Sequence, residues 1–333
     1  MNKLRMMHKR SPSLTGLLFC LVLVACSTTK NLYFQEKEFH HLQRSTELET
    51  VPFYSQKKYQ CGPAAIATVL SHKGFDIKPE ELVREVYLPS RRGSLQIEMR
   101  SAIRKRGFVS YPLEPSFVDL VAEINSGNPV IVMQNLGFSW WPIWHYAVVI
   151  GYNLNDRKVI LRSGTTKRHT TSINRFMRTW KLANQWAQVI VPPSDIPHTA
   201  KPSIWIEAIY EIEQIGQEAI AATGYQKAVD RWPGYRPAWF ALGNISYKIG
   251  DTNTSYKAFI RTIEIDPYSY DGWNNLAHVL GRKGNKACAQ YAAQCAYELK
   301  PDAIDVLSTI QKWGDKNNLK GKCLALISCP LMN

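Results

Sequence analysis

A cysteine in the first half of the chain has the position that nucleophilic catalysis favours. Cys61 precedes Gly62, Pro63 and an apolar run over residues 64–70, and the run ends before Gly74. Proline is favoured in the first turn of a helix, so the pattern predicts that Cys61 opens a helix. A thiol there faces free backbone N–H groups and the positive end of the helix dipole. Both lower its pKa and raise the thiolate fraction.

A histidine further along the chain could be the base for this thiol. His145 begins an apolar run over residues 145–152, which predicts a buried strand with the imidazole at its end. A general base must lie within hydrogen-bond reach of the thiol, and a strand end that faces a helix start allows this. Taken alone, each residue has a simpler interpretation. A cysteine before an apolar helix is usually a buried small hydrophobe, and a histidine at a strand end is usually a core or rim residue.

Three segments together resemble a known family of cysteine peptidases. They are residues 51–56 (VPFYSQ), 61–65 (CGPAA) and 145–152 (HYAVVIGY). The pattern resembles the bacteriocin-processing (double-glycine leader) peptidases and their stand-alone relatives, over roughly residues 48 to 192. The resemblance implies a papain-like α+β fold, with Cys61 as nucleophile and His145 as general base. It also implies that the Gln56 side chain and the Cys61 backbone N–H form the oxyanion hole.

One position departs from the family pattern. The family completes its triad with an Asp on the strand after the histidine, whereas Ser163 stands at that place in residues 158–164. Asp156 is near in sequence, but residues 153–156 have the composition of a hairpin turn away from the site. The third group is therefore Ser163, a residue from elsewhere, or absent. A Cys–His pair can act without a strong third member, because a low thiol pKa supplies much of the activation.

Helices and then strands are predicted across this region. We expect a helix at residues 79–86, a second that Ser94 caps and that runs to about Arg106, and a third that Ser116 caps and that runs to Asn125. Strands are expected at 130–134, 145–152, 158–161 and 186–191. Helices followed by an antiparallel sheet indicate the α+β class. Residues 138–144, between the first two strands, contain three tryptophans. These could form a hydrophobic wall beside His145 or be core anchors.

The N-terminus has the features of an export signal. Basic residues precede an apolar run, residues 14–25, that is too short to span a bilayer comfortably. Residues 23–27 (LVACS) then resemble a bacterial lipobox. This resemblance implies a lipoprotein signal peptide at 1–25, cleavage before Cys26 and lipidation of Cys26. The alternatives are an ordinary secretory signal or a retained membrane anchor.

A lipidated Cys26 would hold the mature chain at the bacterial cell envelope. Acyl chains anchor firmly, because each buried CH₂ contributes about 0.8 kcal/mol. Ser27, in place of Asp, resembles signals sorted to the outer membrane, so we expect the protein on that membrane, facing the periplasm. Residues 26–47 are polar and would form a tether.

Composition fits a folded, exported protein. The length of 333 residues suits about two domains, and the net charge is +14. The signal segment carries four of the basic residues and no acidic ones, so +14 becomes +10 in the mature chain. This excess favours anionic lipid headgroups or acidic peptides, while the basic cluster at residues 100–106 is expected to be a solvated helix face. The sequence has no nucleic-acid motif and no Cys/His spacing typical of zinc, so we expect no nucleic acid, metal or other cofactor.

Four of the seven cysteines lie in the C-terminal region. They are Cys288, Cys295, Cys323 and Cys329. Export permits disulfides among them. Cys288 and Cys295 are about 10 Å apart along one predicted helix, which is too far for a direct bond. Either Cys323 and Cys329 pair with them, or these two close a local loop and the helix cysteines stay free.

A repeat of 34 residues occupies the second half of the chain, after a stiff proline-rich linker at 193–202. The recurring positions are Trp205, Trp239 and Trp273; Gly216, Gly250 and Gly284; and Pro233, Pro267 and Pro301. Period and pattern resemble three tetratricopeptide repeats at residues 203–303. Stacked repeats would form an all-α superhelix, capped by residues 304–333. The resemblance implies a groove for a protein or peptide, although the array could instead only pack against the peptidase domain.

Together these features predict a membrane-anchored periplasmic cysteine peptidase with a repeat domain that binds protein or peptide. Relatives fused to transporters trim leader peptides after Gly-Gly, but this sequence shows neither membrane spans nor a P-loop, so that role is not expected. Two alternatives stay open. One is a catalytically inactive peptidase-like binding or scaffold lipoprotein, which the missing Asp favours. The other is a thiol acyltransferase or transpeptidase, which uses the same pair with an amine acceptor.

Overall fold

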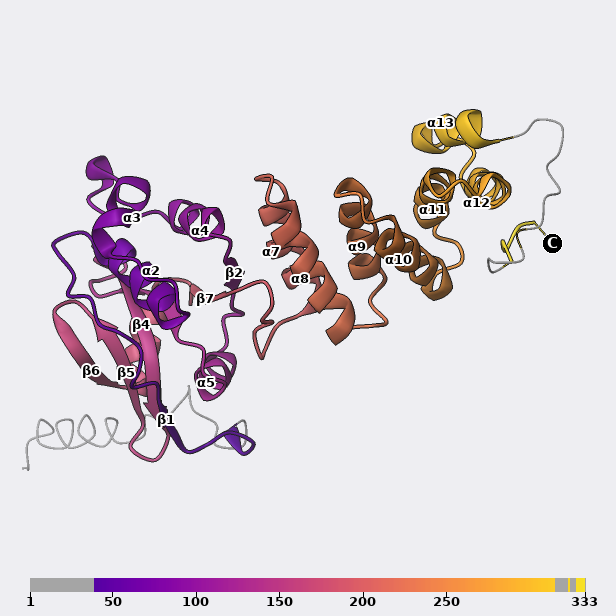
Figure 1. The fold of residues 1–333 in the computed structure, drawn as a ribbon. Helices are drawn as coiled ribbons and strands as arrows, with labels where there is room; N and C mark the ends of the chain where they lie inside the picture. Colours follow the sequence, from indigo (N-terminus) through magenta and orange to yellow (C-terminus); the bar gives the residue numbers. More distant parts are fainter. Residues whose placement is uncertain (1–38, 315–322, 324–327, 333) are drawn as a thin grey trace, which may run out of the picture. The chain divides into compact units, whose positions relative to one another are not determined.

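The computed structural model describes residues 39–314, 323 and 328–332 (Figure 1). The predicted signal peptide, Cys26, most of the tether and residues 315–322, 324–327 and 333 of the predicted C-terminal cap therefore lie outside the described residues. Within the described ranges, every helix is too short or too polar to span a bilayer.

One antiparallel sheet is the frame of the first domain (Figure 1). Its strands are β1 (Ser45–Glu47), β2 (Val109–Pro112), β3 (Val130–Asn135), β4 (Trp144–Asn153), β5 (Lys158–Ser163), β6 (Thr166–Ser172) and β7 (Ala187–Val191). The order is β2-β7-β3-β4-β5-β6, and β1 pairs with β4. The four predicted strands correspond to β3, β4, β5 and β7. The sheet and its helices confirm the α+β class.

Helices of the first domain pack against this sheet. They are α2 (Cys61–His72), α3 (Pro79–Val86), α4 (Gln96–Lys105), α5 (Phe117–Asn125) and α6 (Ile173–Lys181), with a 3₁₀ helix, η2 (Pro89–Arg91), before α4. Ser116 caps α5 as predicted, because its Oγ accepts a hydrogen bond from the Asp119 N–H at 3.2 Å. The cap predicted at Ser94 is wrong. Helix α4 begins at Gln96 without a side-chain cap, and Ser94 instead packs against Gly62.

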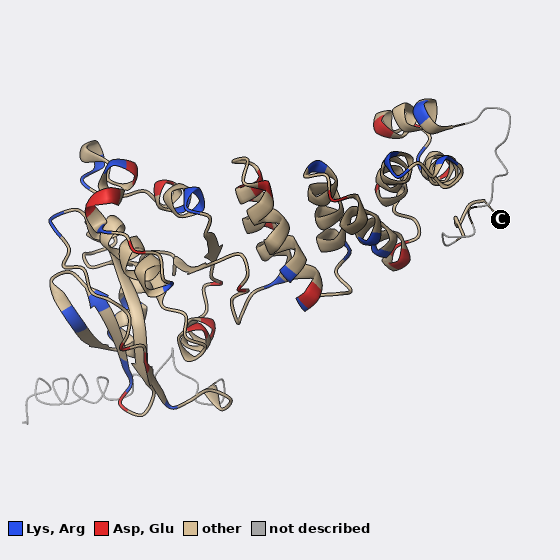
Figure 2. Ribbon diagram, viewed as in Figure 1, with Lys and Arg blue, Asp and Glu red and all other residues tan. Residues whose placement is uncertain are grey.

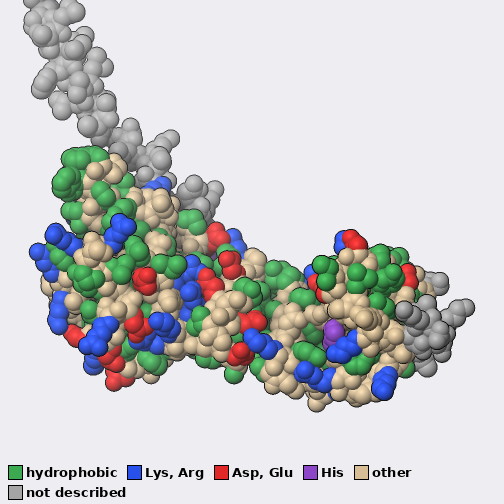
Figure 3. Space-filling model, turned by 90° about the horizontal axis from the view of Figure 1, so that it is seen from above, with side chains coloured by type: hydrophobic (Ala, Val, Ile, Leu, Met, Phe, Trp, Pro, Cys, Tyr) green, Lys and Arg blue, Asp and Glu red, His purple; other side chains and the backbone are tan. Residues whose placement is uncertain are grey.

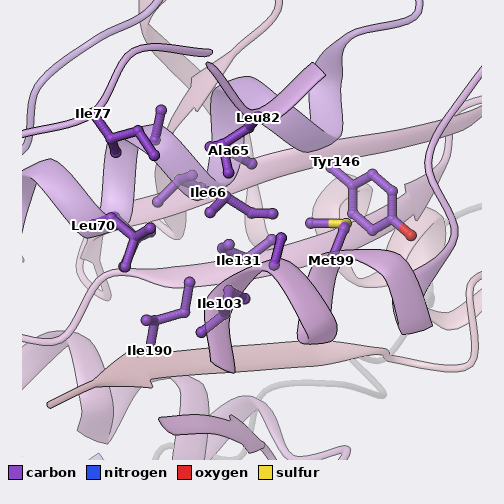
Figure 4. Close-up of a cluster of buried hydrophobic side chains, with 14 of the residues drawn as sticks. Ala65, Ile66, Leu70, Ile77, Leu82, Met99, Ile103, Ile131, Tyr146 and Ile190 are labelled. Carbon is purple, nitrogen blue, oxygen red and sulfur yellow. The ribbon is translucent and has the colours of Figure 1, made fainter. Parts of the chain in front are cut away.

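Helix α2 lies inside a hydrophobic core. Residues 62–70 are all buried, and α2 packs with α3, α4 and the sheet strands (Figure 4). Ile66 and Leu70 of α2 lie among side chains such as Ile131 of β3 and Ile190 of β7. A side chain at Gly62 would collide with Ser94, so glycine permits this close approach. The packing therefore fixes the helix start that carries Cys61.

Helices form the second half of the described chain. They are α7 (Pro202–Glu213), α8 (Glu218–Arg231), α9 (Arg236–Lys248), α10 (Thr252–Ile265), α11 (Tyr270–Arg282), α12 (Lys286–Leu299) and α13 (Ile304–Trp313). Helices begin at 202, 236, 270 and 304, and the second helix of each pair begins at 218, 252 and 286, so both series keep the 34-residue period. The glycines at 216, 250 and 284 have φ of 78°, 87° and 80°, a left-handed conformation that glycine adopts readily. The predicted helical character is confirmed, and the tetratricopeptide assignment stays a prediction.

Two disulfides join α12 to the C-terminal segment. Cys288 bonds Cys323, with Cα atoms 5.0 Å apart, and Cys295 bonds Cys329, with Cα atoms 5.7 Å apart. Of the two pairings that the sequence left open, the local Cys323–Cys329 loop is wrong. Cys61 is the free cysteine among the described residues.

The repeat region contacts the first domain through ion pairs on α4. Residues 42–333 form one compact unit. Arg100 and Arg104 both bind the carboxylate of Glu211 on α7, with Arg104 Nη1 2.6 Å from Oε2. Figure 2 colours the basic residues of α4 blue and the acidic residues of α7 red. Arg106 binds Glu85 at 2.7 Å. The prediction of a solvated basic face is wrong here, because these guanidinium groups are partly buried in structural ion pairs.

Candidate active site

Cys61 and His145 line the same cavity, of about 1020 Å³. Helix α2 supplies Cys61 at its first residue, and β4 supplies His145 near its start. Other walls come from residues 91–97, before and in α4, and from residues 142–144, before and at the start of β4. Residues that are 84 positions apart in the sequence therefore share one site, as the predicted helix start and strand end required.

The Cys61 thiol is held in its neutral form. Burial raises its pKa, and backbone hydrogen bonds with Tyr146, Gly62 and Cys61 itself lower it by less. The sequence predicted a lowered pKa from the helix start. The structure gives the opposite direction, because desolvation of a thiolate in this packed environment outweighs the backbone groups.

His145 is also neutral at physiological pH. Burial lowers the pKa of its imidazole to about 4, and the charge of His169 adds to the effect. The Nε2 atom lies 2.9 Å from Ser163 Oγ. With a proton on Nε2, the imidazole donates to Ser163 and keeps Nδ1 as a free base.

Ser163 therefore occupies the third place that the sequence left open. It ends β5 and contacts the imidazole directly. Its hydroxyl can select the tautomer and orient the ring, but it carries no negative charge to stabilise an imidazolium as an Asp would. Asp156 lies in the turn, where its N–H donates to Asn153 Oδ1 at 2.9 Å, as predicted.

Gln56 is held by three backbone groups around the cavity. Its Nε2 donates to the Tyr146 carbonyl at 3.2 Å, and its Oε1 accepts from the Gly164 N–H at 3.1 Å. Its own N–H donates to the Gly164 carbonyl at 3.0 Å. These bonds fix which way the side-chain amide points. The second proton on Nε2 can then donate to a substrate oxygen, as the oxyanion role requires.

Arg162 supports this arrangement and was missed by the sequence analysis. It is buried, with 5% of its surface exposed, although it is an arginine in an apolar strand. Its guanidinium donates to the carbonyls of Val51, at 2.7 and 3.1 Å, Lys167, at 2.7 Å, and Glu49, at 3.3 Å. Burial lowers its pKa. The arginine thus holds the segment that leads to Gln56 against β5, and it also bonds β6 through Lys167. A charged residue inside the run KVILRS was the available signal.

The tryptophans before His145 are not core anchors. Trp140 is 75% exposed and Trp141 66% exposed. Pro142, Ile143 and Trp144 line the cavity. The predicted hydrophobic wall is therefore limited to these three residues.

The described residues contain no group of three or more His, Cys, Asp or Glu side chains that could hold a metal ion. The groups of the candidate site are the Cys61 thiol, the His145 imidazole, the Ser163 hydroxyl and the Gln56 amide.

Comparisons with known proteins find a family match within the first domain and similar solved structures. Residues 48–188 match the Peptidase_C39 like family. A C39-like peptidase from Bacillus anthracis is 16% identical, with a TM-score of 0.38, over 45% of this chain and 98% of its own. The peptidase domain of Streptococcus ComA, a bi-functional ABC transporter involved in a quorum-sensing pathway, is 18% identical, with a TM-score of 0.35, over 43% and 98%.

A third solved structure is similar to part of this chain. YrrB, a TPR protein with an unusual peptide-binding site, is 19% identical, with a TM-score of 0.32, over 34% of this chain and 59% of its own. No curated protein matches the sequence. Residues 48–188 therefore form a C39-like peptidase domain.

Proposed function

We propose that this protein is a cysteine peptidase that hydrolyses peptide bonds with Cys61 and His145. The observation that carries the proposal is the cavity that Cys61 and His145 share, in which Ser163 Oγ lies 2.9 Å from His145 Nε2. With a proton on Nε2, Nδ1 is left as the base. The match of residues 48–188 to a peptidase family supports the same reading.

The proposed reaction starts from a neutral pair. His145 Nδ1 accepts the thiol proton as Cys61 Sγ attacks the peptide carbonyl carbon. The developing oxyanion accepts hydrogen bonds from Gln56 Nε2 and the Cys61 N–H. His145 then gives its proton to the leaving amine, which departs and leaves a thioester. Water, deprotonated by His145, cleaves the thioester, releases the acid and restores the thiol.

We also propose that the protein acts at the bacterial envelope, anchored through Cys26 and facing the periplasm. The two disulfides support this location, because such bonds persist in oxidising compartments. The repeat region would bind a protein or peptide partner as a tetratricopeptide array. A cavity of about 520 Å³ among α8, α9 and α10, lined by residues such as Trp239, Tyr256 and Arg261, supports a binding role.

Labelling with peptidyl acyloxymethyl ketones tests the proposal. These reagents need both a peptide seated in the cavity and an activated thiol. We expect the label on Cys61, with a rate at least about 100-fold lower in His145→Ala, because a positioned base contributes about that much. His198→Ala, which changes an exposed histidine elsewhere, is the matched control. Equal rates in wild type and His145→Ala would exclude the Cys–His pair.

Product analysis separates the other reaction classes. A peptidase releases a free acid even when a simple amine such as glycinamide is added. A transpeptidase or acyltransferase would instead transfer the acyl group to that amine. A protein that binds peptides but forms neither product would be the inactive scaffold.

A further inference from the structure

An exposed aromatic loop stands beside the active-site cavity. Residues 136–143 join β3 to β4, and we call them, together with Trp144 at the start of β4, the aromatic tip. Its large apolar side chains are more than half exposed: Leu136, Phe138, Trp140, Trp141, Ile143 and Trp144. So many apolar side chains in one exposed loop are unusual for a protein surface and mark an interaction site.

Hydrogen bonds to the backbone fix the conformation of the aromatic tip, although its aromatic rings stay exposed. Asn135 Oδ1 accepts from the N–H groups of Gly137 and Ile143, both at 2.9 Å. Asn135 Nδ2 donates to the Phe138 carbonyl at 3.1 Å, and the Phe138 N–H donates to the Trp141 carbonyl at 3.0 Å. The loop therefore keeps its conformation through hydrogen bonds, and its rings can face the solvent because they are not needed for packing.

The outermost rings do not face the cavity. Phe138, Trp140 and Trp141 are not among its lining residues, although Ile143 and Trp144 are. Phe138 stacks on Trp140 with ring centroids 5.5 Å apart. Peptide-binding sites are concave, whereas these rings project into solvent. Their shape therefore suits the surface of a lipid bilayer better than a peptide. Tryptophan favours the boundary between lipid and water, where its ring is apolar and its N–H stays wet.

Basic residues lie at the cavity beside the aromatic tip. Lys57, Arg91 and Arg92 line the cavity, and no acidic side chain does. Arg91 and Arg92 are exposed. Figure 3 shows hydrophobic side chains gathered on the first domain next to Lys and Arg side chains. This combination of apolar rings and cations is complementary to a bilayer with anionic headgroups.

We propose that the aromatic tip inserts into the surface of an anionic lipid bilayer, with Arg91 and Arg92 on the headgroups. The proposal rests on the proposed envelope location, and it adds a second membrane contact to the Cys26 anchor. The 19 positions from Cys26 to Ser45 span at most about 65 Å, so an anchored chain keeps the aromatic tip near the membrane. The cavity would then face substrates at the membrane surface.

Vesicle flotation tests the proposal independently of catalysis. The chain from residue 26 onward, with Cys26→Ser and Cys61→Ala, is mixed with vesicles of phosphatidylethanolamine and phosphatidylglycerol. We expect binding that weakens with salt and on phosphatidylcholine alone. Trp140→Ser/Trp141→Ser should lower the partition coefficient by about tenfold or more, because two large apolar side chains no longer leave water. Arg91→Gln/Arg92→Gln should reduce binding to the anionic vesicles and flatten its salt dependence.

Tyr268→Ser is the matched control, because Tyr268 is a 65% exposed aromatic residue outside the tip. It should leave vesicle binding unchanged. The proposal is overturned if the parent chain does not bind anionic vesicles, or if the double tryptophan variant binds them as strongly as the parent does. It is also overturned if that variant, with Cys61 restored, binds vesicles normally but has a raised KM for a soluble peptide, which would make the tip a substrate site. Loss of peptidase activity alone would not affect the vesicle result.

Discussion

At the scale of single residues, the candidate site holds two neutral partners. Burial raises the pKa of Cys61 and lowers that of His145 to about 4, so a resting thiolate–imidazolium pair is disfavoured. Ser163 offers a neutral hydroxyl where the related enzymes have a carboxylate, and it does nothing to reverse this. In the proposed reaction, the thiol is therefore activated during attack, with His145 as the general base.

The neutral pair predicts an unusual pH dependence. Protonation removes the base, and His145 takes a proton only near its lowered pKa. Peptidase activity should thus persist down to about pH 5 and fall as pH approaches about 4. The pH dependence of kcat/KM for the wild type measures this loss of activity, which is the acid limb of the profile. His169→Asn, which removes a nearby charge that lowers the His145 pKa, should move the limb to higher pH. An acid limb at the ordinary histidine pKa, about 6.5, would contradict the neutral pair.

At the scale of elements, a buried arginine links the strand pair to the segment that carries Gln56. Arg162 satisfies carbonyls at residues 49, 51 and 167, and Gly164, two residues further on, binds Gln56 through both backbone and side chain. Arg162 is thus a positioning residue, since it contacts neither the thiol nor the imidazole. Its role is to hold the segment of the oxyanion donor against β5.

Replacement of Arg162 should cost stability and activity together. Arg162→Met leaves buried carbonyls without donors, so we expect a loss of about 2–4 kcal/mol in the free energy of unfolding. We also expect a lower kcat with little change in KM, because Gln56 acts on the transition state. Urea unfolding and steady-state kinetics measure the two effects. Arg168→Met, which breaks an exposed pair with Glu47 at 2.8 Å, should change both far less. If Arg162→Met and Arg168→Met had equal effects on stability and kcat, the positioning role of Arg162 would be contradicted.

Sequence patterns predicted some of these elements well and others poorly. Helix α3 and the four inner strands have clear apolar periodicity and end signals, so they could be predicted. Strand β6 has the sequence TKRHTTS, which pairs at a sheet edge with no apolar alternation to reveal it. Helix α6 did carry a helical pattern in its buried Ile173, Phe176, Met177 and Trp180, and it was overlooked. Strand β1 formed from residues 45–47, which were expected in the tether, because pairing with β4 gives a short polar segment its order.

The residues of the candidate site could be predicted from the sequence, but parts of its chemistry and geometry could not. Cys61, His145 and Gln56 could be named because a helix start, a strand end and a family motif mark them. The direction in which the Cys61 pKa shifts could not be predicted, because it depends on how deeply the tertiary packing buries the sulfur. The contact between Ser163 and His145 likewise depends on how β5 pairs with β4, which sequence order does not fix.

At the scale of the whole molecule, a C39-like peptidase domain precedes a helical region with a 34-residue period. Ion pairs of Arg100 and Arg104 with Glu211 join the two, and two disulfides tie the last segment to α12. The period was visible in the sequence, whereas the disulfide pairing was not, because four cysteines allow several connections. In the proposed function, the helical region would bring protein substrates to the cavity.

The most direct test of the central claim is the mapping of new N-termini in a periplasmic protein extract. Wild type and Cys61→Ala are incubated with the same extract, and the termini are identified by mass spectrometry. The proposed function predicts a set of new termini with wild type that is missing with Cys61→Ala and with His145→Ala. Identical termini in all samples would contradict the claim that this protein is a cysteine peptidase.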